Sequence, residues 1–256
     1  MISFLQFSLF KKFKRIKHFI TTRNGGVSKG NYASLNLGMK SGDDHLLVTE
    51  NRALLASALG IETNTLIFPD QCHTDKVGII DDHPDNNQLK ETDALVTNKK
   101  NRCLCILTAD CVPVLLYDTK NNVIAAVHAG WRGTIQMIVS RTVETMMHSF
   151  ASDPLNICAG IGPAISQTVY EVGEDVAQKF REIFGATSGI ISMNAEIGKN
   201  HINLQLANKI LLEKTGILPG NMNILNYCTF SNPDLFFSAR HDGINSGRFA
   251  TGIMLV

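Results

Sequence analysis

Short, closely spaced apolar segments between residues 65 and 127 constrain the fold of this chain more than any other feature. Each segment is only a few residues long, is rich in Val, Ile or Leu, and is separated from the next by small or polar residues. Runs of this length and composition are typical of buried strands, because a helix needs a longer periodic stretch. The segments are residues 65–68, 77–80, 94–97, 103–107, 112–117 and 123–127.

Helices and further strands are predicted around this central block. Residues 43–59 begin with aspartates, carry a leucine stripe and end at Gly60, a pattern that predicts a helix. The other predicted helices are residues 134–150, 173–184 and 203–214, and the other predicted strands are residues 17–22, 156–161, 222–225, 235–239 and 251–256. Because no regular alternation of strand and helix is present, the order favours an α+β fold with a layered, mixed β-sheet flanked by helices.

No repeat, low-complexity stretch or linker divides the 256 residues, so we expect one domain over residues 17–256. Residues 1–16 are predicted to be an N-terminal extension, in which a short apolar start precedes a solvated basic run. A signal peptide has the reverse order, and no segment reaches the length of a membrane span, so the sequence predicts a cytoplasmic protein without membrane contact. The formal net charge of +1 gives no electrostatic reason to expect nucleic acid as a partner.

Three chemically distinctive side chains lie where predicted strands meet turns of small residues. His73 lies in the segment QCHT, Cys111 in TADC and His128 in AVHAGWRG. One thiolate and two imidazoles form a soft ligand set that suits zinc or copper and leaves a fourth position open. If the three segments converge, the sequence therefore predicts a metal site that carries out chemistry.

Three of the other cysteines are expected to be structural. The chain has six cysteines, with neither a CxxC pair nor a disulfide framework. Cys103 and Cys105 alternate along a predicted strand, and Cys158 lies in a similar apolar run. We therefore expect three buried thiols in a reducing compartment.

Two aspartates accompany the predicted ligands in the sequence. Asp110 directly precedes Cys111, and Asp93 lies in the segment TDA. Each is either a residue that caps a turn, or a group that holds a ligand imidazole or moves protons in catalysis.

Further sequence blocks resemble the laccase-domain family, also described as multicopper polyphenol oxidases or peptidoglycan-editing factors, with purine nucleoside phosphorylase as one of its activities. The blocks run in the family's order along nearly the whole chain, at residues 19–28, 32–38, 92–97, 162–165, 170–173 and 237–240, besides the three ligand segments. The resemblance implies one compact layered α/β domain. It also implies that His73, Cys111 and His128 hold a metal, zinc or alternatively copper. His241 stands where most members have a second arginine, and Cys72 where many have valine.

The resemblance further implies phosphorolysis of adenosine, inosine or methylthioadenosine, with adenosine deamination as a side activity. The partners are then a purine nucleoside and phosphate, and the planar fork of an arginine suits phosphate. We assign catalysis to His73, Cys111, His128 and Asp110. The residues predicted to bind substrate are Arg23, Asn36, Arg52, Gln71, Arg132 and Arg240.

Two other activities remain open on the same residues. A copper ion held by one cysteine and two histidines suits phenol oxidation, but the further copper cluster of a laccase needs HxH pairs, and none of the eight histidines forms one. Alternatively, Cys111 is the nucleophile and His128 the base of an amidohydrolase that edits cell-wall precursors.

Overall fold

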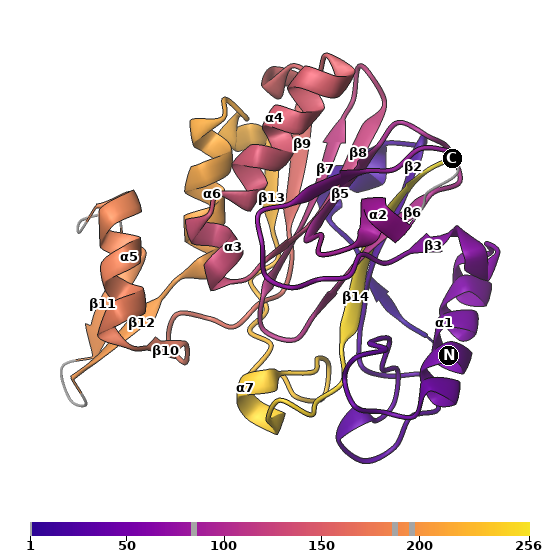
Figure 1. The fold of residues 1–256 in the computed structure, drawn as a ribbon, viewed down its shortest axis with the longest axis horizontal. Helices are drawn as coiled ribbons and strands as arrows, with labels where there is room; N and C mark the ends of the chain where they lie inside the picture. Colours follow the sequence, from indigo (N-terminus) through magenta and orange to yellow (C-terminus); the bar gives the residue numbers. More distant parts are fainter. Residues whose placement is uncertain (1, 83–85, 186–188, 195–197) are drawn as a thin grey trace.

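The structure of the chain, a computed structural model, describes residues 2–82, 86–185, 189–194 and 198–256. Its strands form two large sheets and one small sheet (Figure 1). The first sheet has the order β1 (Phe4–Leu5), β2 (Ile16–Thr21), β14 (Phe249–Leu255), β6 (Cys103–Thr108) and β3 (Leu66–Ile67). The second has the order β13 (Met222–Ile224), β9 (Ile157–Ile161), β7 (Val112–Asp118), β8 (Val123–Ala129), β5 (Ala94–Thr97) and β4 (Val77–Ile79). The small sheet has the order β10 (Glu171–Val172), β12 (Lys199–Ile202) and β11 (Ile191–Asn194).

Helices cover the outer faces of the two large sheets. The helices are α1 (His45–Leu59), α2 (Asn86–Leu89), α3 (Trp131–Ile135), α4 (Ile138–Phe150), α5 (Glu174–Phe184), α6 (Leu204–Lys214) and α7 (Ala239–Asp242). Short 3-10 helices are η1 (Ser8–Lys12), η2 (Gly30–Tyr32), η3 (Thr63–Thr65), η4 (Pro154–Asn156) and η5 (Pro219–Asn221). Figure 1 shows α5 and the small sheet projecting from the main body beside α6. None of the helices in the described residues is long and apolar enough to cross a membrane.

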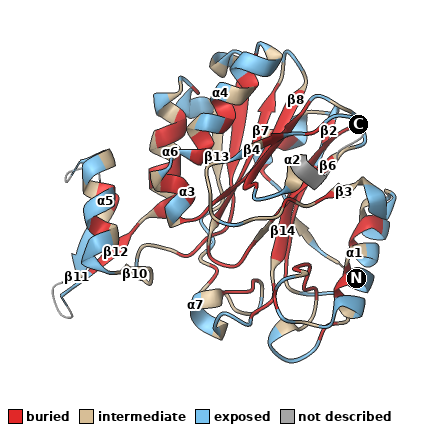
Figure 2. Ribbon diagram, in the orientation of Figure 1, coloured by how far each residue is buried: buried red, intermediate tan, exposed pale blue. Residues whose placement is uncertain are grey.

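The two large sheets pack face to face, which explains the apolar character of the central strands. Successive side chains of a strand point to opposite faces. In β7, Val114 and Leu116 join the core beneath α4 and α6. Leu115 and Tyr117 join the core between the sheets. Both faces are therefore buried, as the concentration of buried residues in the strands of Figure 2 shows. The predicted layered fold with mixed sheets and flanking helices is confirmed.

The helix predicted over residues 134–150 is interrupted. After α3 the chain adopts a left-handed backbone conformation at Met137, with a φ of 60°, and only then begins α4. Ile135 and Ile138 pack against the same hydrophobic core on either side of this break. The apolar pattern therefore continues without change across the break between α3 and α4, so the sequence pattern could not indicate the break.

The strand predicted at residues 235–239 is wrong. Phe236 and Phe237 are fully buried, but the structure assigns no strand to this segment, and α7 begins at Ala239 with Ser238 as its N-cap. Two buried aromatic rings produce the same apolar signal as a short strand. The small sheet was not predicted, because β12 consists largely of polar residues.

The apolar part of the predicted N-terminal extension packs against the core. β1 pairs antiparallel with β2, and Phe7 and Phe10 are 0% and 1% exposed. Burial of each phenylalanine contributes about 1.5–3 kcal/mol to the free energy of folding. This gain opposes the conformational entropy that the segment loses when it is ordered. Only the basic side chains that follow, such as Lys11 and Lys12, lie in solvent as expected.

His18 links this segment to β2 and makes the stability of the protein depend on pH. Its side chain is 5% exposed, and its Nε2 accepts a hydrogen bond from the backbone N–H of Phe7 at 3.0 Å. Burial lowers the pKa of His18 from 6.5 to about 4. As the pH falls below 6.5, His18 is therefore protonated in the unfolded chain while it stays neutral in the folded chain.

We expect the free energy of unfolding to fall by about 3 kcal/mol from this group alone between pH 7 and pH 4. Below pH 4 both states are protonated and the loss stops. Urea unfolding at a series of pH values measures the effect, with His18→Gln as a control that keeps an acceptor for Phe7 but does not titrate. A stability difference between the two proteins that is the same at pH 7 and pH 4 would contradict the prediction.

Candidate metal centre and its cavity

The structure brings the three predicted ligands together. Cys111 immediately precedes β7 and His128 lies on β8, and the antiparallel pairing of these strands sets Pro113 opposite His128. His73 comes from the loop between β3 and β4. The candidate ligand atoms all lie within 4.8 Å of one another, and Cys111 Sγ lies 3.9 Å from His73 Nε2. Separations of roughly 4 Å suit ligands that each lie about 2.0–2.3 Å from a shared ion.

One buried carboxylate, that of Asp93, orients two of these ligands. It accepts hydrogen bonds from the backbone N–H groups of Cys72, His73 and Thr74 at 3.1, 3.0 and 2.8 Å. These bonds hold His73 in a left-handed conformation with a φ of 64°, which is uncommon outside glycine. Asp93 Oδ1 also lies 2.7 Å from His128 Nδ1. Because the carboxylate fixes a hydrogen on Nδ1, Nε2 is the nitrogen of His128 that is left to bind a metal.

The charges of Asp93, His128 and Cys111 stabilise one another. Burial raises the pKa of the Cys111 thiol, but the charges and hydrogen bonds of His128 and His73 outweigh burial and lower that pKa to about 6. Burial lowers the pKa of His128, whereas the Cys111 thiolate and Asp93 raise it to about 9. Burial also raises the pKa of Asp93, but His128 and the backbone donors hold it well below its usual range. The thiolate, which is the form that binds metals, is therefore favoured at neutral pH.

Gly130 leaves room for the cluster at the end of β8. A Cβ atom at this position would lie 2.8 Å from Cys111 Sγ and 3.0 Å from His73 Cδ2. Side chains do not approach so closely, so glycine is the residue that allows both ligands to occupy these positions.

The donor set fits a transition metal. A cysteine and two histidines are ligands that zinc and copper prefer, and three protein ligands leave an open position, as in catalytic sites. The second ring nitrogen of His128 is held by a carboxylate, which is the usual outer support of a metal-bound imidazole. Among the described residues, this is the cluster whose side chains meet as a metal requires.

A cavity of about 1070 Å³ opens beside the three ligands. Apolar parts of its wall come from Phe68, Leu89 and Leu107. Its charged lining residues are the cations Lys40, Arg52, Lys90, Arg240 and Arg248 and the acids Asp70 and Asp110. The excess of positive charge favours a ligand that carries negative charge.

Three of the six residues predicted to bind substrate line this cavity: Arg52, Gln71 and Arg240. The Gln71 amide is already occupied by the backbone of Leu107. Its Nε2 donates to the Leu107 carbonyl oxygen and its Oε1 accepts from the Leu107 N–H, both at 2.8 Å. Gln71 therefore holds the end of β6 in place at the cavity wall.

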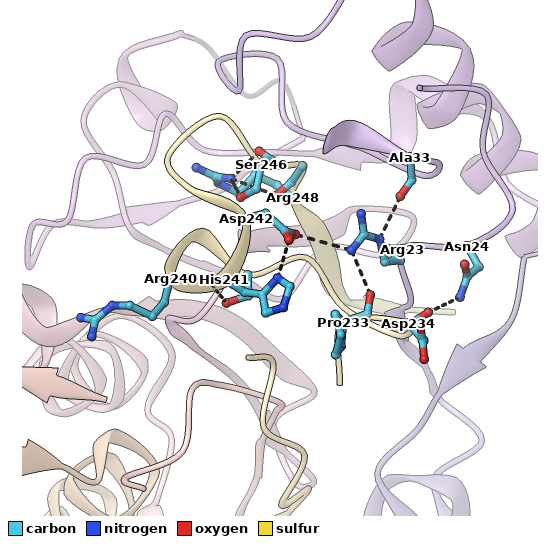
Figure 3. A network of polar contacts seen from close by, with 12 residues as sticks. Arg23, Asn24, Ala33, Pro233, Asp234, Arg240, His241, Asp242, Ser246 and Arg248 are labelled. Carbon is cyan, nitrogen blue, oxygen red and sulfur yellow. Dashed lines mark hydrogen bonds and ion pairs between the residues drawn. The ribbon is translucent and has the colours of Figure 1, made fainter. Parts of the chain in front are cut away.

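Arg23 is instead committed to the loops around it. It donates to the carbonyl oxygens of Ala33 and Pro233, both at 2.9 Å, and lies 3.5 Å from Asp242 (Figure 3). Its guanidinium also stacks on Phe237, at 4.6 Å from the ring centroid. These contacts tie the loop before η2 to the segment that leads into α7.

Asn36 and Arg132 also lie outside the described lining of the cavity. Asn36 is fully buried and its Oδ1 accepts hydrogen bonds from the backbone N–H groups of Gly38 and Arg248. Arg132 is exposed on α3, where its guanidinium stacks on Trp131. Asn36 therefore joins the backbone at Gly38 to that at Arg248, and Arg132 is an exposed residue of α3 whose charge reaches Tyr170 of the cavity lining.

Asp110 accepts hydrogen bonds in the way expected of an aspartate that caps a turn, the first of its two predicted roles. Its Oδ1 accepts hydrogen bonds from the hydroxyls of Thr229 and Ser238 at 2.6 and 2.7 Å, and its Oδ2 accepts one from the backbone N–H of Arg240 at 2.7 Å. These bonds occupy the carboxylate and fix the start of α7, and with it Arg240, at the edge of the cavity.

Several lining residues were not predicted as site residues, among them Tyr170 and Arg248. Tyr170 lies beneath the Arg240 guanidinium, 5.3 Å from its ring centroid, and burial, followed by the charge of Cys111, raises the pKa of its hydroxyl. Tyr170 lies in one of the blocks that resemble the family, so the sequence could have indicated it. Arg248 lies in none of these blocks, and its place in the cavity depends on the loop that precedes β14.

The fold and the site define a layered α/β domain with a candidate His–Cys–His metal centre beside a cation-lined cavity. The chain belongs to the multi-copper polyphenol oxidoreductase laccase family, whose sequence model matches residues 17–256. The predicted family membership is confirmed. The family description refers to several coppers, whereas the described residues of this chain present one such three-ligand cluster.

Similar proteins share nearly the whole chain. A purine nucleoside phosphorylase of Bacteroides thetaiotaomicron is 40% identical, over 98% of this chain and 96% of its own. Adenosine deaminase RL5, from an unknown prokaryotic organism, is 35% identical over 99% of both chains. The crystal structure of the hypothetical protein YfiH of Bacillus licheniformis superposes with a TM-score of 0.91 at 31% identity, covering 96% of this chain and 95% of that one.

Proposed function

We propose that this protein is a purine nucleoside phosphorylase with a metal centre that also deaminates adenosine. Relatives that share nearly the full chain are named for these two activities. The observation that carries the proposal is the combination of a His–Cys–His cluster with a cation-lined cavity. The volume of that cavity suffices for a nucleoside and a phosphate together.

We propose zinc as the metal, with copper as the alternative, held by His73, Cys111 and His128. Such an ion supplies Lewis acidity and an open coordination position. Elemental analysis together with the visible spectrum separates the two metals, because copper bound to a thiolate gives an intense visible band and zinc gives none.

Phosphorolysis requires an anion held beside the ribose and a purine held against an apolar wall. A phosphate oxygen forms a bond to C1′ while the C1′–N9 bond breaks, and the electron pair leaves with the purine, which then takes up a proton. The arginines of the cavity stabilise the phosphate charge, and Phe68 and Leu107 offer apolar surface to the base. Tyr170 keeps its proton, so its hydroxyl can donate a hydrogen bond to the departing base.

The test is a phosphate-dependence assay on purified protein of known metal content. Wild type is expected to release free base and ribose 1-phosphate from inosine only when phosphate is present. It is expected to deaminate adenosine with or without phosphate. Cys111→Ala should reduce both activities by more than the ~10–100-fold that is typical of losing an outer partner of a metal ligand. Wild type with stoichiometric metal and no turnover of either nucleoside would refute the proposal.

A second candidate function rests on the alignment of Cys111, His128 and Asp93. His128 lies between the thiol and the carboxylate, and against the effect of burial it lowers the pKa of that thiol, together with His73, to about 6. An activated thiolate, a base and an orienting acid form the arrangement of cysteine amidohydrolases. Amide hydrolysis by metal-free protein that iodoacetamide blocks would favour this candidate, and activity that chelators abolish would exclude it.

We also propose a cytoplasmic location. All six cysteines are free thiols, and the predicted burial of Cys103, Cys105 and Cys158 is confirmed. Free thiols persist in reducing compartments. Fractionation of cells that express the full chain tests this proposal, and recovery with the soluble cytoplasmic enzymes is the expected result.

A further inference from the structure

Two arginines of the cavity are half-buried and form no ion pair with an acid in the described part of the chain. Both Arg52, on α1, and Arg248, before β14, line the cavity and are half-buried. The ion pairs of the described residues include neither of them. By contrast, Lys40 in the same lining pairs with Asp70. A guanidinium that is withdrawn from water without a counter-charge is costly, so this pair of charges requires an explanation.

Backbone carbonyl groups hold Arg52 in place without neutralising it. Its Nε and Nη2 donate to the carbonyl oxygen of Leu37 at 3.1 and 2.8 Å, and its guanidinium lies 4.0 Å from the centroid of the Phe68 ring. The stacking offsets part of the cost of burial. Nη1 makes no hydrogen bond to the described residues and is not among their sealed polar atoms, so it remains available to a ligand.

Arg248 is held in the same way by the loop before it. Its Nη1 donates to the carbonyl oxygens of Ser246 and Gly247 at 2.6 and 2.9 Å. Burial lowers the pKa of Arg248, and the negative charges of Cys111 and Asp110 only partly oppose that effect. The guanidinium therefore lies within the electrostatic reach of the metal centre.

The two arginines are neighbours because they attach to the same short stretch of chain. Leu37 accepts hydrogen bonds from Arg52 through its carbonyl oxygen and donates its N–H to the carbonyl oxygen of Arg248 at 3.0 Å. At Gly38 a Cβ atom would lie 2.8 Å from Arg248 Cγ, so the absence of a side chain lets Arg248 approach. The fold thus places two fixed positive charges, neither of them in an ion pair with a described residue, in the lining of the cavity.

We infer that Arg52 and Arg248 form an oxyanion subsite that binds a phosphate group. Planar guanidinium forks match the geometry of phosphate oxygens, and a bound phosphate provides the direct counter-charge that no ion pair of the described residues supplies. The subsite takes free phosphate if the proposed phosphorylase function holds. The 5′-phosphate of a nucleotide has the same chemistry, and the experiment below separates the two sources.

The experiment is isothermal titration calorimetry of the metal-quantified full chain with inorganic phosphate, AMP and adenosine. Wild type is compared with Arg52→Met, Arg248→Met and the matched control Arg141→Met, whose exposed side chain pairs with Asp75 away from the cavity. We expect phosphate affinity to fall at least ~10-fold in both cavity variants and to stay within ~2-fold in the control. Adenosine affinity should change by less than ~3-fold. Circular dichroism and the melting temperature verify folding, and Arg52→Met remains a valid test if Arg248→Met loosens its loop.

Phosphate affinity that stays within ~2-fold of wild type in folded Arg52→Met would overturn the inference, as would a wild type that binds neither phosphate nor AMP. If AMP binds with the same dependence on Arg52 and free phosphate does not, the subsite holds the phosphate ester of a nucleotide. If phosphate binding depends on Arg52 but no nucleoside is cleaved, the subsite stands and the proposed phosphorylase function fails.

Discussion

Asp93→Asn is expected to weaken zinc binding by ~10–100-fold and to lower the free energy of unfolding of the metal-free protein by about 3–5 kcal/mol. The carboxylate is fully buried and serves the N–H groups of residues 72–74 and the ring of His128 at the same time. An asparagine has one acceptor oxygen, and its NH₂ group faces donors. At least one buried N–H group therefore loses its partner, and the left-handed conformation of His73 loses its support.

Zinc affinity is measured by competition with a chelator of known affinity, and stability by urea unfolding after metal removal. Asp44→Asn is the matched control, because Asp44 caps α1 by accepting the N–H of Leu46 and asparagine caps equally well. The control should change stability by less than ~0.5 kcal/mol and leave zinc affinity unaltered. Zinc affinity of Asp93→Asn within a factor of three of wild type would show that the carboxylate does not position the ligands.

Gly130→Ala is expected to reduce the rate of nucleoside turnover by at least ~100-fold, because a misplacement of about 1 Å at a reacting centre has an effect of this size. The added methyl group would meet Cys111 Sγ at 2.8 Å and His73 Cδ2 at 3.0 Å. One ligand or both must move away, and the geometry that three ligands share is lost. The cost in stability should be only about 1–3 kcal/mol, which is typical of a single overpacked position.

The measurement is the steady-state rate on inosine together with the number of zinc ions bound per chain. Gly220→Ala provides the matched control, because a Cβ atom there meets nothing within 4 Å. That control should keep the wild-type rate and metal content. Full activity and full metal content in Gly130→Ala would mean that the ligands are not held as closely as the structure places them.

Much of the fold was predictable because burial leaves a local trace in the sequence. β7 and β8 are buried on both faces, so nearly every residue in them is apolar and the strands stand out. An apolar run gave the wrong secondary structure where residues are buried without forming a regular strand or an unbroken helix. Phe236 and Phe237 are buried without forming a strand, and the apolar pattern around Met137 continues through a break between two helices.

The metal ligands were predictable because few residue types bind transition metals, and these three lie at strand ends with recognisable neighbours. Their support was not predictable. The sequence offered both aspartates and assigned catalysis to Asp110, whereas the structure shows that Asp93 faces His128 and that Asp110 caps α7. The difference depends on which distant segments each carboxylate meets.

The sequence by itself determined the family, the His–Cys–His set and the strands of the two large sheets except β1, because each of these depends on residue type and short-range pattern. Only the tertiary structure decided which arginines serve the cavity. Arg23 was a reasonable candidate and proved to hold loops together, whereas Arg248 had no motif and lies in the cavity wall. An arginine has the same side chain in either place. Its function follows from the carbonyl groups, rings and acids that the fold brings to it from distant parts of the chain, and no local pattern records those contacts.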